Sequence, residues 1–348
     1  MIVTPAPPPS TSGTALGAPL ILTRFIGRLS LQGVVLHVYQ TALVLALAPL
    51  LSGIITRVEA ILQSKRGPSI FQPYYDLWKY FHKQTVRPQT ASPLFRWTPP
   101  IAFGAVVFVS LVVPVVVGFP MPLAFSADLL FGAFFLVLSS FVVSLAGLDA
   151  SSPYGNLGSS RAIFVGAVSE PTLILVFFNV GLLSQSDNPY VLNSALASSP
   201  LEVLGPAHLF TLFAFFMILL AENGHVPITG PGGHMELGMI DEARVLEYSG
   251  PELALLEWTS DAKQFIMFGI FVNVFFLPWG GALASPSLGP LLGSTGLILL
   301  EMLVVAALVV VVDTSFSKLR LFRIAEYFGA SFALALVSLL TVFIGGGF

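Results

Sequence analysis

Residues 290–312 have the sequence PLLGSTGLILLEMLVVAALVVVV, in which Glu301 is the only charged side chain. About 20 apolar residues in a helix cross the roughly 30 Å hydrocarbon core of a bilayer. Because that core offers no water to backbone groups, a spanning segment must be a helix or a strand of a closed barrel. Barrel strands alternate apolar and polar residues, so this unbroken apolar run favours a transmembrane helix.

The whole chain shares this apolar character. Of its 348 residues, 55% are hydrophobic and only 9% are charged, whereas roughly 25% of the residues in an average soluble domain are charged. The fold class we predict is an all-α integral membrane protein with about eight transmembrane helices. The predicted spans lie near 32–56, 100–119, 129–148, 162–183, 204–221, 264–284, 290–312 and 324–345.

Residues 31–348 form a single transmembrane domain in this interpretation, and residues 1–30 form a flexible, outward-facing tail. The spans leave four inner loops, which are 57–99, 149–161, 222–263 and 313–323. All basic residues except Arg24 and Arg28 lie in these loops. Cytoplasmic loops of membrane proteins carry an excess of Lys and Arg. We therefore expect both termini outside the cytoplasmic membrane of a prokaryote.

Two inner loops have patterns that exceed those of simple connectors. Bulky apolar residues recur at helical spacing between Ile70 and Phe81, which predicts an amphipathic helix in the headgroup plane. A surface helix packed on a partner subunit is the alternative. The loop 222–263 contains eight of the 18 acidic residues, interleaved with apolar ones. It is either a solvated acidic surface or a segment folded against another element.

Two acidic residues lie inside predicted spans, Glu170 in the fourth and Glu301 in the seventh. A charged side chain at the bilayer centre costs on the order of 2.5 to 3.5 kcal/mol on insertion scales, so such a residue usually faces a polar interior. Burial keeps a carboxyl group near the range where it exchanges protons. This favours a proton relay over the alternative, a neutral glutamic acid with a structural role.

The sequence assigns no cofactor to this chain. It has no cysteine, which excludes thiolate metal sites and cysteine-ligated iron–sulfur clusters. His208 has no second ligand at helical spacing and is predicted to be a core histidine. The pair His225 and His234 lacks the spacing of a helical metal site. The chain alone shows no catalytic set, so its predicted partners are the lipid bilayer and other proteins, and not nucleic acid.

Three stretches of the inner loops resemble one known family. They are RGPSIFQPYYDLWKYF at 66–81, GLDASSPYGNLGSSR at 147–161, and LAENGHVP with HMELGMIDEARVLEYSGPELALLEW between 220 and 258. The chain resembles the membrane-anchor subunit shared by respiratory complex I and by the energy-converting group 4 nickel–iron hydrogenases. The short stretch from Lys65 to Pro73 is similar to the hydrogenase-4 and formate hydrogenlyase branch.

The resemblance implies a subunit of an ion-pumping oxidoreductase that is not catalytic alone. Iron–sulfur clusters, and a nickel–iron centre or a quinone, then belong to the partner complex. The implied partners are a hydrogenase-like large subunit, a small iron–sulfur subunit and antiporter-like membrane subunits. The resemblance and the buried acids together suggest a proton path through Glu170, Glu222, Glu236, Glu242, Glu247 and Glu301. Docking is expected at Arg66, Gln72, Asp76, Lys79, Asp149, Arg161 and Tyr248.

One departure from the family pattern bears on that path. Relatives commonly have Pro-Phe-Asp after the glutamate of the fifth span, whereas this chain has Pro227, Ile228 and Thr229. A relay that needs this aspartate must use neighbours such as Glu236. The electron acceptor, protons or a quinone, and the pumped ion, proton or sodium, stay open at this stage. So do a stand-alone secondary transporter and an inert structural anchor.

Overall fold

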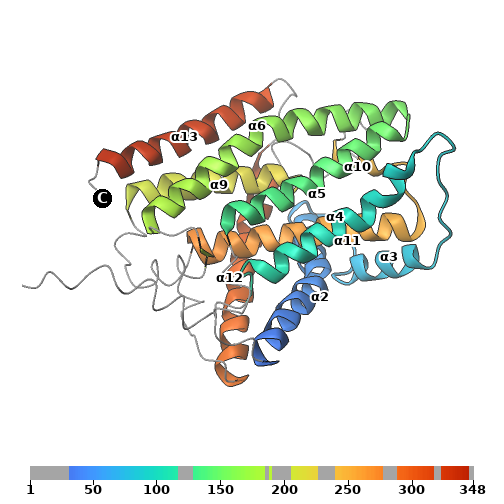
Figure 1. Ribbon diagram of the computed structural model, residues 1–348. Coiled ribbons are helices and arrows are strands. Elements are labelled where there is room, and N and C mark those ends of the chain that lie inside the picture. The colour runs from blue at the N-terminus through green and yellow to red at the C-terminus, as the bar shows by residue number, and fades with distance from the viewer. Residues whose placement is uncertain are drawn as a thin grey trace, which may run out of the picture.

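The computed structural model describes residues 31–116, 128–184, 188–189, 205–225, 240–276, 288–316 and 323–344, and the regular structure in these ranges is helical. Figure 1 shows the arrangement. The helices are α2 (Leu31–Leu62), α3 (Gln72–Phe81), α4 (Pro93–Val112), α5 (Leu129–Asp149), α6 (Pro153–Ser184), α9 (Pro206–Glu222), α10 (Asp241–Val245), α11 (Gly250–Ile270), the π-helix η2 (Phe271–Phe276), α12 (Leu288–Ser315) and α13 (Ile324–Ile344).

The all-α membrane fold is confirmed. Six helices in the described ranges are long and apolar enough to cross a membrane, namely α2, α4, α5, α6, α12 and α13. The fifth predicted span corresponds to α9, a shorter apolar helix. The sixth corresponds to α11 with its continuation η2. The exact number of eight spans stays a prediction, and the tail 1–30 lies outside the described residues.

Several helix boundaries differ from the predicted spans. Helix α4 begins at Pro93, because Ser92 caps it by accepting a hydrogen bond from the Leu94 N–H at 3.2 Å. It ends at Val112, and Val113 is extended, as expected for a residue that precedes a proline. Hydropathy had placed this span near 100–119. It does not detect caps or helix-ending prolines within an apolar run.

Helices α6 and α11 begin well before the apolar runs from which their spans were predicted. Helix α6 starts at Pro153 and has 32 residues, which corresponds to roughly 48 Å. Helix α11 starts at Gly250, inside the acidic loop. Both helices are therefore longer than a hydrocarbon core of about 30 Å requires. Much of the segments 149–161 and 222–263, which we expected as loops, is helical.

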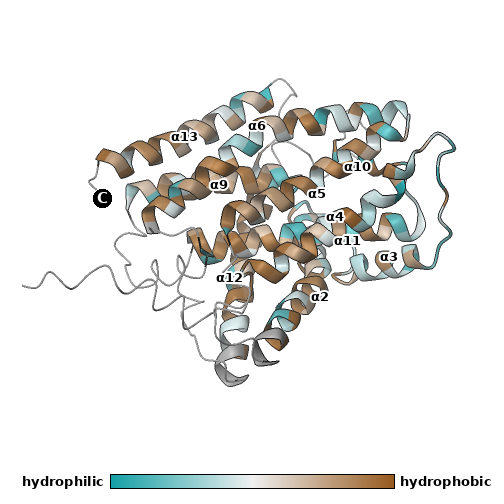
Figure 2. Ribbon diagram, viewed as in Figure 1, coloured by the Kyte–Doolittle hydropathy of each residue, from teal (hydrophilic) through white to brown (hydrophobic). Residues whose placement is uncertain are grey.

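Packing places α11 at the centre of the described helices, against α2 and α4, while α5 lies between α4 and α6, and α13 covers α6 and α9. Hydrophilic residues gather around α3, α10 and the starts of α4 and α6, whereas the middles of the helices are hydrophobic (Figure 2). We call this part of the bundle the charged end. It contains the predicted inner loops that the structure describes.

The predicted amphipathic helix is confirmed as α3. Leu77 is buried against the bundle, whereas Tyr75 and Trp78 are 63% and 71% exposed. The Tyr74 hydroxyl donates to the carbonyl of Ala46 on α2, and Phe81 packs edge-on against Trp258 of α11. These contacts hold one side of α3 against α2 and α11 and leave an aromatic side uncovered in this chain.

Candidate functional site

The polar centre of the molecule forms where α9 ends beside the middle of α6. Ser169 Oγ of α6 donates a 2.7 Å hydrogen bond to Oε1 of Glu222, the last residue of α9. Ser169 lies roughly 24 Å along α6 from Pro153, given about 1.5 Å per residue. Glu222 therefore lies deep in the bundle, although its position at the end of an apolar run suggested the inner membrane boundary.

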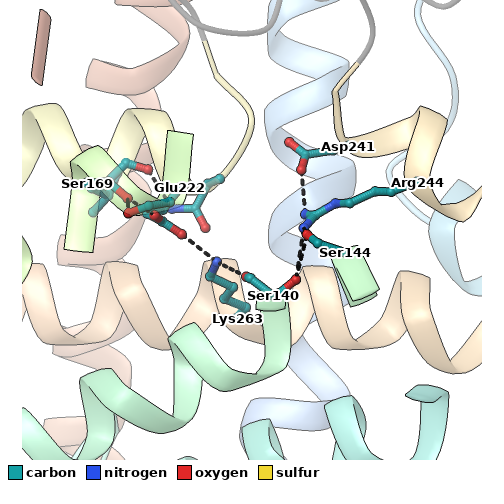
Figure 3. A network of polar contacts seen from close by, with 10 residues as sticks. Ser140, Ser144, Ser169, Glu222, Asp241, Arg244 and Lys263 are labelled. Carbon is teal, nitrogen blue, oxygen red and sulfur yellow. Dashed lines mark hydrogen bonds and ion pairs between the residues drawn. The ribbon is translucent and has the colours of Figure 1, made fainter. Parts of the chain in front are cut away.

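Lys263 of α11 compensates the Glu222 carboxylate. Its Nζ donates to Glu222 Oε2 and to Ser140 Oγ of α5, each at 2.7 Å (Figure 3). The side chains of Lys263 and Glu222 are only 10% and 14% exposed. A charge pair this buried remains ionised only when hydrogen bonds satisfy both partners. Four helices, α5, α6, α9 and α11, contribute to this cluster, which we call the Glu222 cluster.

Arg244 of α10 adds a second cation next to the Glu222 cluster. Its Nη1 donates to the Ser140 carbonyl at 3.2 Å and to Ser144 Oγ at 3.1 Å, and its Nη2 donates to Asp241 Oδ1 (Figure 3). Close helix packing makes this possible, because a Cβ on Gly147 or Gly158 would meet Arg244 or Ala243. Short α10 is thus held between α5 and α6.

Two cavities reach this polar centre. One, of about 200 Å³, is lined by Glu170, Glu222, Asp241, Arg244 and Lys263. The other, of about 280 Å³, is lined by Glu222, Glu242, Glu257 and Lys263 among others. A water molecule occupies about 30 Å³ in the liquid. Each cavity can hold several waters that connect carboxylates, which is the physical requirement for proton exchange between them.

The predicted path residues are therefore only partly brought together. Glu170 and Glu222 line one cavity, and Glu242 lines the second. Glu247 is half-buried and lines neither of these cavities. Glu301 is buried on α12, and its Oε2 has no hydrogen-bond partner among the described residues. Glu236 lies outside the described residues.

The predicted docking residues divide into a surface group and an internal group. Arg66 and Lys79 are exposed and Gln72 and Asp76 half-buried on or just before α3, where Gln72 Nε2 donates to the Asp76 carboxylate at 3.1 Å. Arg161 is half-buried on α6. Asp149 accepts a 2.8 Å hydrogen bond from the Ser92 N–H, which joins the end of α5 to the start of α4.

Tyr248 belongs to the internal group. It is 4% exposed, its ring stacks on Phe95 at 3.9 Å between centroids, and its hydroxyl donates to the Phe95 carbonyl at 2.8 Å. Burial raises the pKa of its phenol well above the ordinary value. Its ring supports the loop from within the chain and does not face a partner directly.

The acidic segment is tied to the rest of the chain, as its apolar residues predicted. Arg87 donates two hydrogen bonds to Glu252 Oε1, at 2.9 and 2.5 Å. Ser249 Oγ accepts from the Val86 N–H at 2.8 Å and donates to the Val86 carbonyl at 2.9 Å. The pKa of Arg87 is raised by its hydrogen bonds to Glu252 and by the charge of that carboxylate.

Sequence reasoning missed several residues of the polar centre. Lys263 was counted only as a loop cation, while Ser140 and Ser169 lie in apolar runs and gave no signal of their own. His208 behaves as predicted, since it is buried with its Nε2 at 2.9 Å from the Phe275 carbonyl. A basic residue at the edge of an apolar run, with an acidic residue ending the run before it, is the signal that pointed to the Glu222–Lys263 pair.

Comparison with known proteins supports this picture. The family described as NADH dehydrogenase matches residues 34–344. Hydrogenase-4 component C of Escherichia coli K12 is 31% identical over 305 residues, which is 87% of this chain and 93% of that protein. Formate hydrogenlyase subunit 4 of the same organism is 30% identical, over 86% of this chain and 97% of that protein.

Two further comparisons extend the range of relatives. A membrane subunit of the NADH-quinone oxidoreductase of Rubrobacter xylanophilus is 29% identical over 258 residues, covering 71% of this chain and 76% of that protein. A chain of the membrane-bound sulfane sulfur reductase, described as an archaeal respiratory membrane complex, superposes with a TM-score of 0.74. The two share 20% identity, and the match covers 89% of this chain and 98% of that one, so it shows a shared fold.

Proposed function

We propose, because this chain belongs to the NADH dehydrogenase family of membrane proteins, that it is the membrane subunit of a complex I-like, redox-driven ion pump. It docks the hydrophilic redox arm and couples electron transfer to the translocation of protons or sodium ions. Its relatives are membrane subunits of hydrogenase and respiratory complexes. The chain contributes no cysteine to a redox centre, so iron–sulfur clusters and a nickel–iron centre or quinone reside on its partners.

The Glu222 cluster is the observation that carries the coupling part of this proposal. It places a buried carboxylate, a buried lysine and the nearby Glu170 around one cavity. The charge state of each group depends on the others, because a buried ion loses its compensation when its partner changes charge. A charge arriving at the charged end therefore alters proton affinity several helical turns inside the bundle.

The docking part of the proposal is supported by α3 and its flanking loops. Arg66, Lys79 and Trp78 are exposed there together with the half-buried Gln72 and Asp76. Aromatic and charged residues on one uncovered face favour a protein partner or the headgroup region of the bilayer. Asp149 and Arg161 lie at the same charged end and complete the proposed docking region, which faces the cytoplasm if both termini are outside.

The alignment lengths favour the hydrogenase type over the quinone-reducing type. The two hydrogenase relatives align over 87% and 86% of this chain. The NADH-quinone and NADH-ubiquinone relatives compared with it align over 57% to 71%. We therefore assign this chain to a group 4 hydrogenase-type complex, with a nickel–iron large subunit, a small iron–sulfur subunit and antiporter-like membrane subunits as partners.

Photo-crosslinking in membranes tests the docking proposal. A photo-reactive amino acid at position 78 should crosslink to a hydrophilic subunit whose sequence contains four nickel-binding cysteines. The matched control is the same amino acid at position 134, where Phe134 is 55% exposed in the middle of α5. This control should crosslink only to lipid or to membrane subunits. Crosslinks from position 78 to lipid alone would overturn the docking proposal.

A further inference from the structure

A second buried charge pair joins the segment after α9 to α12. The Nδ1 atom of His225 lies 2.7 Å from Oδ2 of Asp313, and the two side chains are 12% and 2% exposed. An ionised carboxylate only accepts hydrogen bonds, so the imidazole must donate from Nδ1. Asp313 thereby fixes the tautomer of His225 and directs its other nitrogen, Nε2, away from the pair.

Gln264 of α11 occupies that other nitrogen. Its amide Nε2 lies 2.8 Å from His225 Nε2, so the amide donates to the lone pair of a neutral imidazole. When the imidazole takes up a proton, Nε2 becomes a donor and needs an acceptor. The amide oxygen of Gln264 supplies one when the side-chain amide turns over, because its two ends are nearly equal in size. The site can hold His225 in either charge state without losing a hydrogen bond.

The electrostatic surroundings of His225 come from four helices. Asp313 is on α12, and Glu59 of α2 lies within electrostatic range of both His225 and Asp313. On α9, Glu222 is bonded to Lys263 of α11, the residue before Gln264. Each of the two networks thus takes one residue from the end of α9 and one from adjacent positions of α11. They are two neighbouring but separately bonded polar sites.

We propose that His225 is a proton-exchanging site of this chain, separate from the Glu222 cluster, with Asp313 as the positioning residue and Gln264 as the adaptable partner. A proton from water binds the Nε2 lone pair and forms an imidazolium, which the Asp313 carboxylate stabilises. The reverse step returns the proton to water. Its use in ion translocation rests on the function proposed above, whereas the protonation itself does not.

Nitrogen-15 NMR of the intact, histidine-labelled complex tests protonation directly. The signals lost in H225Q identify His225, and we expect them to titrate between about pH 5 and 8, where an ordinary imidazole changes charge. In D313N the midpoint should fall by about one pH unit or more, because the imidazolium loses an opposite charge within hydrogen-bond distance. A histidine that stays neutral over this range, or an unshifted midpoint in D313N, would overturn the proposal whether or not the complex pumps.

Ion translocation by the reconstituted complex then tests the role of the site. The double variant H225Q/D313N keeps an amide–amide hydrogen bond but has no titrating group, and T314A, next to Asp313, removes a hydroxyl that bonds only within α12. We expect H225Q and the double variant to lose translocation severalfold and T314A to match wild type. Wild-type translocation in the double variant would show a packing contact only. A wild-type complex that transfers electrons without moving ions would instead refute the proposed function.

Discussion

The substitution K263M removes the cation that compensates Glu222. The lysine ammonium makes 2.7 Å hydrogen bonds to Glu222 and Ser140, and methionine fills much of the same volume without a charge. Breaking a buried ion pair by removing one partner costs about 3 to 5 kcal/mol, since the remaining charge is left without compensation. The Glu222 carboxylate can limit this cost by taking up a proton.

The size of the limited cost follows from the pH. Keeping a glutamic acid protonated at pH 7, against an unfolded-state pKa of about 4.3, costs about 3.7 kcal/mol at 1.36 kcal/mol per pH unit. At pH 5 the same step costs about 1 kcal/mol. In K263M the folded state holds the proton and the unfolded state releases it, so stability is lost as pH rises. We expect a deficit of about 3 to 4 kcal/mol at pH 7 that shrinks to about 1 kcal/mol at pH 5.

Denaturation of the purified chain in lipid nanodiscs at both pH values measures this deficit. The matched control is K65M, since Lys65 is exposed and bonds only Gln63, and it should change stability by less than about 0.5 kcal/mol. The double variant E222Q/K263M should recover most of the pH 7 deficit, because no unpaired charge remains. A K263M deficit that is independent of pH, or that equals the K65M value, would refute the buried pair.

Three further predictions concern other contacts. Y248F removes only the hydrogen bond to Phe95 and should cost about 1 kcal/mol of unfolding free energy, whereas Y248A also removes the stacked ring and should cost about 3 to 5 kcal/mol; equal losses would show that the ring contributes nothing. G250A should destabilise the chain by more than about 1 kcal/mol, because Gly250 has φ +62° and a Cβ there would lie within 3.0 Å of the Lys83 and Gln84 carbonyls, and unaltered thermal unfolding would contradict this. E301Q should lower ion translocation per electron less than E170Q does, because Glu301 lies on α12 and does not line the cavity shared by Glu170 and Glu222; an equal or larger loss would place Glu301 on the main path.

Hydropathy and charge were sufficient to predict the fold class, the order of the apolar helices and the amphipathic helix α3. These features depend on local composition and periodicity, which a single sequence records. The family motifs also pointed to Glu170 and Glu222 before their positions were known. The depth of Glu222 could not be predicted, because it depends on where the end of α9 packs along α6 and not on the local sequence.

Contacts between distant segments were equally hidden. His225 and Asp313 are 88 residues apart, and neither residue has a spacing that indicates the other. Tyr248 lies in an acidic segment that resembles a docking surface, yet it packs on Phe95 because α4 begins earlier than the apolar run suggested. Helix caps and tertiary packing, which hydropathy does not measure, decided these positions.

The number of ions translocated per electron, measured in proteoliposomes that contain the intact complex, tests the central claim most directly. Wild type and E170D both keep a titratable carboxyl group at the cavity and should pump with electron transfer. E170Q keeps the size and hydrogen-bonding capacity of the side chain but cannot exchange a proton. We predict that E170Q assembles and transfers electrons with a strongly reduced ratio of ions to electrons. An unchanged ratio in E170Q would contradict a proton path through the cavity of Glu170 and Glu222.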